Sequence, residues 1–234
     1  MHDALCGLLL AELFLCLAQE LSEDERERIF KLLEDHPEVH FAVTVASNQR
    51  IDDVNILQAS LESMAKSVVK LQNRGHPVDY ALVDGNRMPK WFVSTSGCCN
   101  VEFRAVSCLA RTHRMPCPTE TIVKGDSKSV AIAAASIVAK VTRDRLMLKY
   151  HAQYPEYGFA QHKGYPVPEH MRAVFKHGPS PIHRITFAPV KHRADVGDRL
   201  ESIMAARAQR KATNSGEWWH VADTNTKAWA SKDL

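Results

Sequence analysis

The chain has 234 residues, of which 45% are hydrophobic and 24% are charged, so one domain with a packed core is affordable. The net charge is only +3, but residues 1–60 carry 12 acidic residues against 4 Lys and Arg, and residues 124–193 carry 12 Lys and Arg against 4 acidic residues. No long run of like charges is present, which favours a folded basic surface over a basic tail. A folded basic half indicates a surface that meets a polyanion, and the alternative is a solvated face without a ligand.

The cysteine pattern excludes the common zinc motifs, because no two of the six cysteines form a CxxC pair. We therefore expect reduced thiols in an intracellular protein, located in the cytoplasm, or in the nucleus or an organelle if the source is eukaryotic. The weaker alternative is a metal site built from the residues between positions 98 and 117: Cys98, Cys99, Cys108, His113 and Cys117.

Residues 1–20 begin with an apolar run that lacks a basic start, contains Glu12 and is too short to span a bilayer. Its apolar residues follow helical spacing. This pattern predicts a helix rather than a signal peptide, and no contact with a membrane.

A helix and a strand are predicted next. Ser22 followed by Glu25 is typical of a capping box, and the helix that it opens runs to about Asp35. Residues 39–47 then alternate, as a half-buried strand should, and one face carries Val39, Phe41, Val43 and Val45.

A second helix is predicted from Asp53, and Gly75 and Pro77 end it. Its apolar residues recur at steps of four and three and form one stripe: Leu57, Leu61, Met64, Val68 and Leu71.

Two short strands follow, and each ends at a glycine-flanked aspartate. "DYALVDGN" predicts a strand that stops at Asp84, and "TETIV" (119–123) predicts one that stops just before Lys124-Gly125-Asp126. A helix is then expected from about 127 to 151. Strand, amphipathic helix and strand in alternation indicate the α/β class.

Asp84 and Asp126 are the first candidates for chemistry. Ligands of open α/β sheets gather at the carboxyl ends of strands, where carboxylates from different strands can converge on a hard cation. Each aspartate alone is more often a cap or turn residue, so the metal interpretation depends on the pair.

Four stretches carry a more specific signal: "VDGNRMPK", "VKGDSKSVAIAAASIVAKVTRDRLM", "YPEYGFAQHKGYP" and "IHRITFAPVK". In this order they resemble the motifs of bacterial-type ribonuclease HII. "LSEDERERIF" and "IDDVNILQASLESMAKSV" are similar to the same family further upstream. The resemblance covers residues 21 to about 192.

The resemblance implies a ribonuclease H-like fold, a mixed sheet flanked by helices with a helical C-terminal part. It implies an endonuclease that cleaves the RNA strand of RNA/DNA hybrids, and ribonucleotides embedded in DNA, to leave 5′-phosphomonoesters. It also implies Mg²⁺ or Mn²⁺ at a two-metal site of four carboxylates, in which Asp84 and Asp126 are metal ligands and catalytic residues. Two such ions can clamp an in-line displacement at phosphorus.

The resemblance further implies contacts with nucleic acid. Lys140 and Lys163 are expected to bind phosphates, and Tyr165 to pack against the sugar on the DNA side of an RNA–DNA junction. The alternative for Tyr165 is a turn aromatic that shields the core. The weaker candidates for phosphate contacts are Asn86, Arg87 and Arg184. The alternative for Arg184 is that it forms a structural pair with His183 on a loop.

The helix after Asp126 suggests two structural roles. Asp144 lies four residues after Lys140, on the same face, and is expected to pair with a neighbouring base rather than with a metal. A run of small residues should let the helix pack close to the sheet: Ala131, Ala133, Ala134, Ala135 and Ser136.

The chain departs from the family in one motif, an Asp-Glu-x-Gly-Arg-Gly strand that supplies two of the four carboxylates. Residues 1–20 contain no adjacent acidic pair. We therefore expect a sheet without its first strands, weak binding of two metal ions and little activity.

The expected domain organisation is a non-family segment at 1–20, a ribonuclease H-like domain at 21–192 with an irregular insertion at 91–115, and an extension at 193–234. The hypothesis is a retained intron and a wrong first exon in the gene model, which transcript sequencing tests. The expected partner is an RNA/DNA hybrid or a DNA duplex that contains ribonucleotides, bound by a monomer. The alternatives are a hybrid-binding protein without catalysis and a fragment that does not fold.

Overall fold

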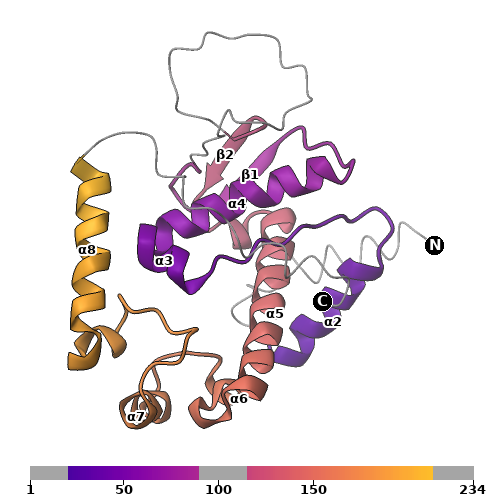
Figure 1. Ribbon diagram of the computed structural model, residues 1–234. Helices are drawn as coiled ribbons and strands as arrows, with labels where there is room; N and C mark the ends of the chain where they lie inside the picture. The colour runs from indigo at the N-terminus through magenta and orange to yellow at the C-terminus, as the bar shows by residue number, and fades with distance from the viewer. Residues whose placement is uncertain (1–20, 90–114, 213–234) are drawn as a thin grey trace.

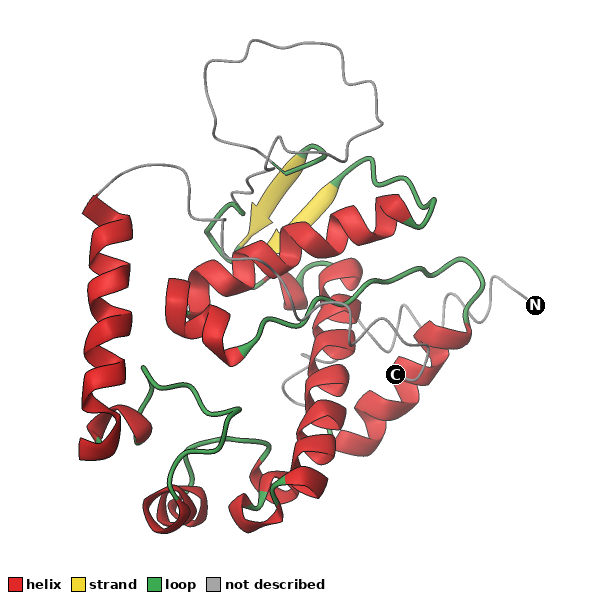
Figure 2. Ribbon diagram, viewed as in Figure 1, coloured by secondary structure: helices red, strands yellow, loops and turns green. Residues whose placement is uncertain are grey.

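The structure, a computed structural model, describes residues 21–89 and 115–212, which form a small sheet among helices (Figure 1). The two strands and seven helices of this part (Figure 2) are α2 Glu23–Asp35, α3 Asn48–Val54, α4 Ile56–Asn73, β1 Ala81–Asp84, β2 Thr119–Ile122, α5 Val130–Gln153, α6 Phe159–His162, α7 Pro168–His177 and α8 Gly197–Ala212. The expected α/β class is confirmed. None of these helices is long and apolar enough to cross a membrane.

Several predicted segments lie outside the described residues: the helix in 1–20, the insertion at 91–115 except its last residue, and the end of the extension beyond residue 212. Five of the six cysteines lie there too. The described one, Cys117, is a free, half-buried thiol.

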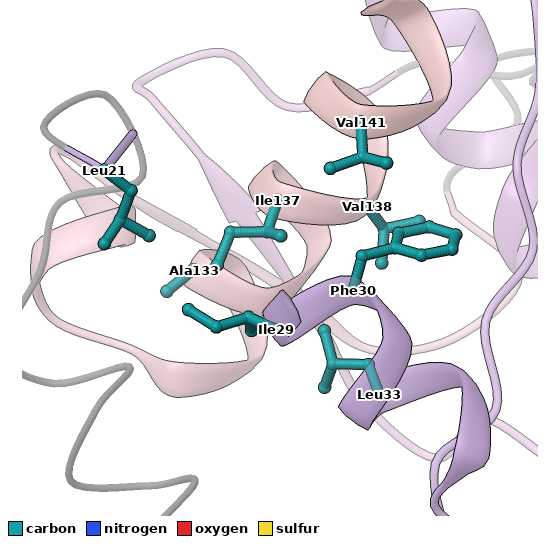
Figure 3. Packing of buried hydrophobic residues seen from close by; sticks show 8 residues of the cluster. All are labelled: Leu21, Ile29, Phe30, Leu33, Ala133, Ile137, Val138 and Val141. Carbon is teal, nitrogen blue, oxygen red and sulfur yellow. The ribbon is translucent and has the colours of Figure 1, made fainter. Parts of the chain in front are cut away.

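Helix α2 packs against α5 and forms the first hydrophobic core (Figure 3). The predicted capping box is confirmed, because the Ser22 hydroxyl accepts the N–H of Glu25 at 3.3 Å and the Glu25 carboxylate accepts the N–H of Ser22 at 2.8 Å. Each large side chain buried in this core stabilises the fold by about 1.5–3 kcal/mol. The core consists of Leu21, Ile29, Phe30, Leu33, Ala133, Ile137, Val138 and Val141.

The run of small residues on α5 faces α2 along only part of its length. Ala133 is buried in this core and Ala134 packs against it. Ala131 and Ala135 are exposed, so the prediction that the whole run packs against the sheet is wrong for these two residues. The reason is geometric, because successive residues of an α-helix point in different directions and a run of five cannot share one face.

Residues 39–46 form no strand and pair with no described strand, so the predicted strand is wrong in this part of the chain. Much of the predicted alternation survives without the strand. Val45 is 57% exposed, whereas three apolar residues pack against the α2–α5 core: Val39, Phe41 and Val43.

Two side chains at the C-terminal end of α4 donate hydrogen bonds to backbone carbonyls of this segment, as the N–H groups of a neighbouring strand would. The ammonium group of Lys70 donates to the carbonyl of Val43 at 2.9 Å. The guanidinium group of Arg74 donates to the carbonyl of Phe41 at 3.3 Å. These two bonds satisfy carbonyls that a neighbouring strand would otherwise pair.

The helix predicted from Asp53 is two helices, α3 and α4, with Asn55 between them. Asn55 has a φ of 81°, which interrupts the helix. Its N–H donates to the carbonyl of Ile51 at 2.9 Å and its side chain accepts the N–H of Gln58 at 3.1 Å, so it ends one helix and begins the next. The predicted apolar stripe is wrong at Leu57, which is 45% exposed.

Strands β1 and β2 are parallel and directly paired, with Ala81 opposite Thr119 and Asp84 opposite Ile122. Both predicted strands are confirmed within one residue at their carboxyl ends. Helix α4 covers one face of the sheet (Figure 1), where Ala65 of α4 and Ala81 of β1 share a small core with Met115.

The C-terminal part is helical, as expected, and has its own core: Tyr157, Phe159, Val174, Ile185, Val190 and Val196. Residues beyond 192 take part in this fold. Arg193 donates to the carbonyl of Val174 at 2.8 Å. Arg207 of α8 donates to the carbonyls of Ile51 and Asp53, which holds α8 against α3 (Figure 1).

Candidate active site and nucleic-acid interface

Asp84 and Asp126 lie at the same edge of the sheet. Asp84 is the last residue of β1 and pairs with Ile122, and Asp126 lies in the 3₁₀ turn that follows β2. Oδ1 of Asp84 accepts the N–H of Gly125 at 2.7 Å. The residue next to Asp126 is therefore hydrogen-bonded to the carboxylate of Asp84.

A side chain at Gly125 would force its neighbours in this turn to move. A Cβ at this position would overlap Cδ1 of Ile132 and lie 3.2 Å from Oδ1 of Asp84. Lys124 before it adopts a left-handed conformation with a φ of 55°. The carbonyl of Gly125 accepts the N–H of Ser129 at 2.8 Å, so the same residue also leads into α5.

Carboxylates such as those of Asp84 and Asp126 are the type of ligand that a hard divalent cation takes from a protein. One oxygen of Asp84 already accepts an N–H, and within the described ranges the carboxylate of Asp126 has no hydrogen-bond or ion-pair partner. Mg²⁺ commonly binds through one or two carboxylates and completes its shell with waters and substrate phosphates. In residues 21–89 and 115–212 no group of three or more His, Cys, Asp or Glu is arranged to hold a metal. The described residues therefore offer too few protein ligands to hold two metal ions.

A cationic pair on α5 lies over the ring of Tyr165. The Lys140 ammonium is 5.5 Å and the Arg143 guanidinium 5.0 Å from the ring centre, within the range of cation–π attraction. Both cations also contact Asp144, at 3.0 Å and 3.6 Å. Asp144 is buried, which confirms its predicted structural role. Tyr165 is 53% exposed, which does not fit the alternative of a ring that shields the core.

Lys163 is less available for a phosphate than the sequence suggested. Its ammonium donates to the carbonyl of Ala160 at 2.9 Å and lies 3.3 Å from the carboxylate of Glu23. The side chain is only 12% exposed. A phosphate contact by Lys163 therefore requires the lysine to leave Glu23.

Arg184 lies near the cationic pair. Its guanidinium stacks 3.7 Å from the ring centre of Phe187. Burial lowers the pKa of Arg184, and the positive charge of Arg143 acts in the same direction. Asn86 and Arg87 are exposed directly after β1, next to the edge that carries the two aspartates.

Two features of this region were missed by the sequence analysis. Arg143 was not predicted to contact nucleic acid, although it lies three residues after Lys140 and shares its helix face. His170 and His183 are buried with their Nε2 atoms 3.1 Å apart. No local pattern pairs these two histidines, because one lies on α7 and the other in the loop that follows.

Comparison with known proteins identifies one family. The family model described as Ribonuclease HII matches residues 12–190, close to the range of the motif resemblance. A ribonuclease HII of Endomicrobium trichonymphae is 41% identical over 173 residues, which cover 74% of this chain and 70% of the relative. A ribonuclease HII of Chlamydia muridarum is 42% identical over 174 residues, 74% of this chain and 67% of the relative. A ribonuclease HII of Xanthomonas oryzae is 39% identical, and this chain covers 58% of its length.

Proposed function

The chain belongs to the ribonuclease HII family of ribonuclease H type endoribonucleases, and from this premise we propose its substrate, its metal ligands and its contact residues. The substrate is an RNA/DNA hybrid, or a DNA duplex that contains ribonucleotides, and the RNA strand is cleaved. One Mg²⁺ or Mn²⁺ ion binds to Asp84 and Asp126.

The hydrogen bond from Gly125 to Asp84 is the observation that carries this proposal. It joins the ends of two neighbouring strands, so that the carboxylates on either side of it belong to one small region. A bound cation supplies a Lewis acid that polarises the scissile phosphate and lowers the pKa of bound water. The chain contributes carboxylate oxygens that the ends of β1 and β2 hold close together.

The duplex lies along the surface formed by Lys140, Arg143 and Tyr165. The two cations face the phosphate backbone, where charge provides affinity but no reading of sequence. The exposed ring of Tyr165 packs against a sugar, since the sugar is where RNA and DNA differ. All these residues belong to one chain, so the proposal needs only a monomer.

A second candidate function is binding of the hybrid without cleavage. The observation that favours it is that the described residues offer two carboxylates and no third metal ligand near them. The basic surface and Tyr165 do not depend on those carboxylates, so such a protein would keep its affinity for the duplex.

Incubation of the full chain with a labelled RNA/DNA hybrid and Mg²⁺ or Mn²⁺ separates the two functions. Cleavage that is lost in both Asp84→Asn and Asp126→Asn supports the endonuclease. The matched control is Asp79→Asn, because Asp79 is exposed just before the opposite end of β1.

Binding of the hybrid without cleavage, unchanged in the two aspartate variants, supports the second function and contradicts the first. Cleavage that survives both substitutions also contradicts the assignment of these ligands. A chain that neither binds nor cleaves the hybrid excludes both functions.

A further inference from the structure

Three histidines gather beside the loop 163–165, and the proposed function uses none of them. His162 lies on α6, His170 on α7 and His183 in the loop after α7. His170 is 6% exposed and His183 is 9% exposed. The rings of His162 and His170 are stacked, with their centres 4.5 Å apart.

A backbone N–H determines which nitrogens of the buried pair carry protons, because an N–H can only donate. The N–H of Ser180 donates to Nδ1 of His183 at 3.0 Å, so neutral His183 carries its proton on Nε2. This Nε2 lies 3.1 Å from Nε2 of His170, which therefore accepts. Neutral His170 then carries its proton on Nδ1, which is 2.9 Å from the carbonyl of Tyr165. All three bonds run in one direction and end at Tyr165.

The other residues of the loop are held at the backbone as well. The N–H of Gly164 donates to Nδ1 of His162 at 3.1 Å. The guanidinium of Arg143 donates to the carbonyl of Lys163 at 2.8 Å. Each residue of the loop 163–165 therefore has one backbone group bonded to a side chain of α5, α6 or α7, while the ring of Tyr165 is left exposed.

We propose that His170 and His183 are positioning residues that hold Tyr165 for its contact with the sugar of an RNA/DNA duplex, and that they do so only while both imidazoles are neutral. The inference rests on the proposed function, because that function gives Tyr165 its substrate. Neither histidine touches the duplex; both act through the carbonyl of Tyr165. A proton added to Nε2 of His170 faces the N–H of His183, and a proton added to Nδ1 of His183 faces the N–H of Ser180. Either proton places two donors face to face and breaks the relay.

The surroundings favour the neutral forms. Burial lowers the pKa of His183 to about 4, and His170 acts in the same direction. Burial also lowers the pKa of His170, against the effect of its bond to the Tyr165 carbonyl. The titratable groups that face the pair are Tyr157, whose ring centre is 4.9 Å from that of His183, and His162. Among the described residues no carboxylate bonds to either imidazole.

The tautomers test the relay without any nucleic acid. In the full chain labelled with ¹⁵N-histidine, long-range ¹H–¹⁵N spectra at neutral pH should show His170 protonated on Nδ1 and His183 protonated on Nε2. A merely space-filling pair of histidines has no reason to adopt these two different tautomers. Protonation of His170 on Nε2 overturns the inference.

Binding tests the connection to Tyr165. The dissociation constant of a fluorescein-labelled RNA/DNA hybrid is measured by anisotropy for the wild type, His170→Phe and His170→Asn. Loss of the bond in His170→Phe should weaken binding about fivefold, in line with one hydrogen bond. His170→Asn retains an N–H donor near the position of Nδ1 and should recover most of the affinity. In a Tyr165→Ala background, His170→Phe should have no further effect.

His192→Phe is the matched control, since His192 is exposed and outside the relay. If the wild type binds the hybrid and His170→Phe has the same dissociation constant, this inference alone is overturned. A wild-type chain that does not bind the hybrid overturns the proposed function and this inference together. If His170→Phe unfolds at the assay temperature, the histidine tautomers measured in the wild type decide whether the relay exists.

Discussion

The carboxylate of Asp52 on α3 accepts both the N–H of Thr186 at 3.0 Å and its hydroxyl at 2.6 Å. It also accepts the N–H of Ile185 at 2.7 Å, and its side chain is 3% exposed. A single buried carboxylate thus joins α3 to the loop that carries His183 and Arg184. It is one of the contacts that connect α3 to the C-terminal part of the chain.

We expect Asp52→Ala to destabilise the fold by about 2–3 kcal/mol, because it leaves the buried N–H of Ile185 and the half-buried N–H of Thr186 without an acceptor. Urea unfolding followed by circular dichroism measures the change in the free energy of unfolding. Asp79→Ala, at an exposed position, should change it little. Equal effects of the two substitutions contradict the role of Asp52.

We expect Gly125→Ala to destabilise the turn at the sheet edge by about 1–3 kcal/mol, since the added Cβ overlaps Cδ1 of Ile132. Ile132→Val removes that atom, so the double variant should recover part of the loss. Gly197→Ala is the control, because a Cβ there meets nothing within 4 Å. Thermal unfolding compares the variants, and a Gly125→Ala midpoint equal to that of Gly197→Ala would refute the steric argument.

The stability of the chain should fall as the pH falls from about 6.5 to about 4, because burial lowers the pKa of His183 to about 4. A histidine with a lowered pKa binds fewer protons in the folded than in the unfolded state. The stability that depends on its neutral form is therefore complete above the unfolded pKa and is lost through this interval.

Urea unfolding at a series of pH values measures this dependence. His183→Phe should show a smaller loss between pH 6.5 and 4 than the wild type, whereas His192→Phe should keep the wild-type slope. An identical pH profile for the wild type and His183→Phe shows that another group titrates.

Lys140→Ala and Arg143→Ala should each weaken binding of the hybrid and reduce the slope of log K against log salt by about 1. The loss of affinity should be the same for hybrids of different nucleotide sequence, because the contacts are with phosphates. Lys31→Ala, at an exposed position on α2, is the matched control. An equal change of slope in that control indicates general charge attraction rather than a defined surface.

Mn²⁺ should bind the described site with a stoichiometry of one ion per chain, since two carboxylates and no third protein ligand lie there. Isothermal titration in the presence of uncleavable hybrid measures it, and chelation should reverse it. Asp84→Asn and Asp126→Asn should each abolish binding, whereas Asp79→Asn should not. Two ions per chain would show that ligands outside the described residues complete the site.

Much of the local structure was predictable, because its signals lie within a few residues of one another. The capping box of Ser22 and Glu25 involves a single helix turn. The ends of β1 and β2 are marked by glycines in the following turns. The family resemblance rested on contiguous motifs of the same kind, and the comparisons with known proteins confirm it.

The predicted strand failed because the partners of its residues lie far away in sequence. Residues 39–46 alternate as a strand does, yet α4 side chains rather than a strand bond their carbonyls. The ion pair of Lys163 with Glu23 on α2, which bears on its predicted phosphate contact, was likewise not visible in the sequence. Alternation and charge describe a segment's own chemistry and do not reveal which segment it meets.

The sequence by itself determined the class of fold, the two strand-end aspartates and the family. Only the tertiary structure decided that Gly125 joins these strand ends, that Asp52 reaches across to Thr186, and that His183 and His170 form a directed chain to Tyr165. The physical reason is that a hydrogen bond depends on the distance and direction between two groups. For residues up to 134 positions apart, folding alone sets both.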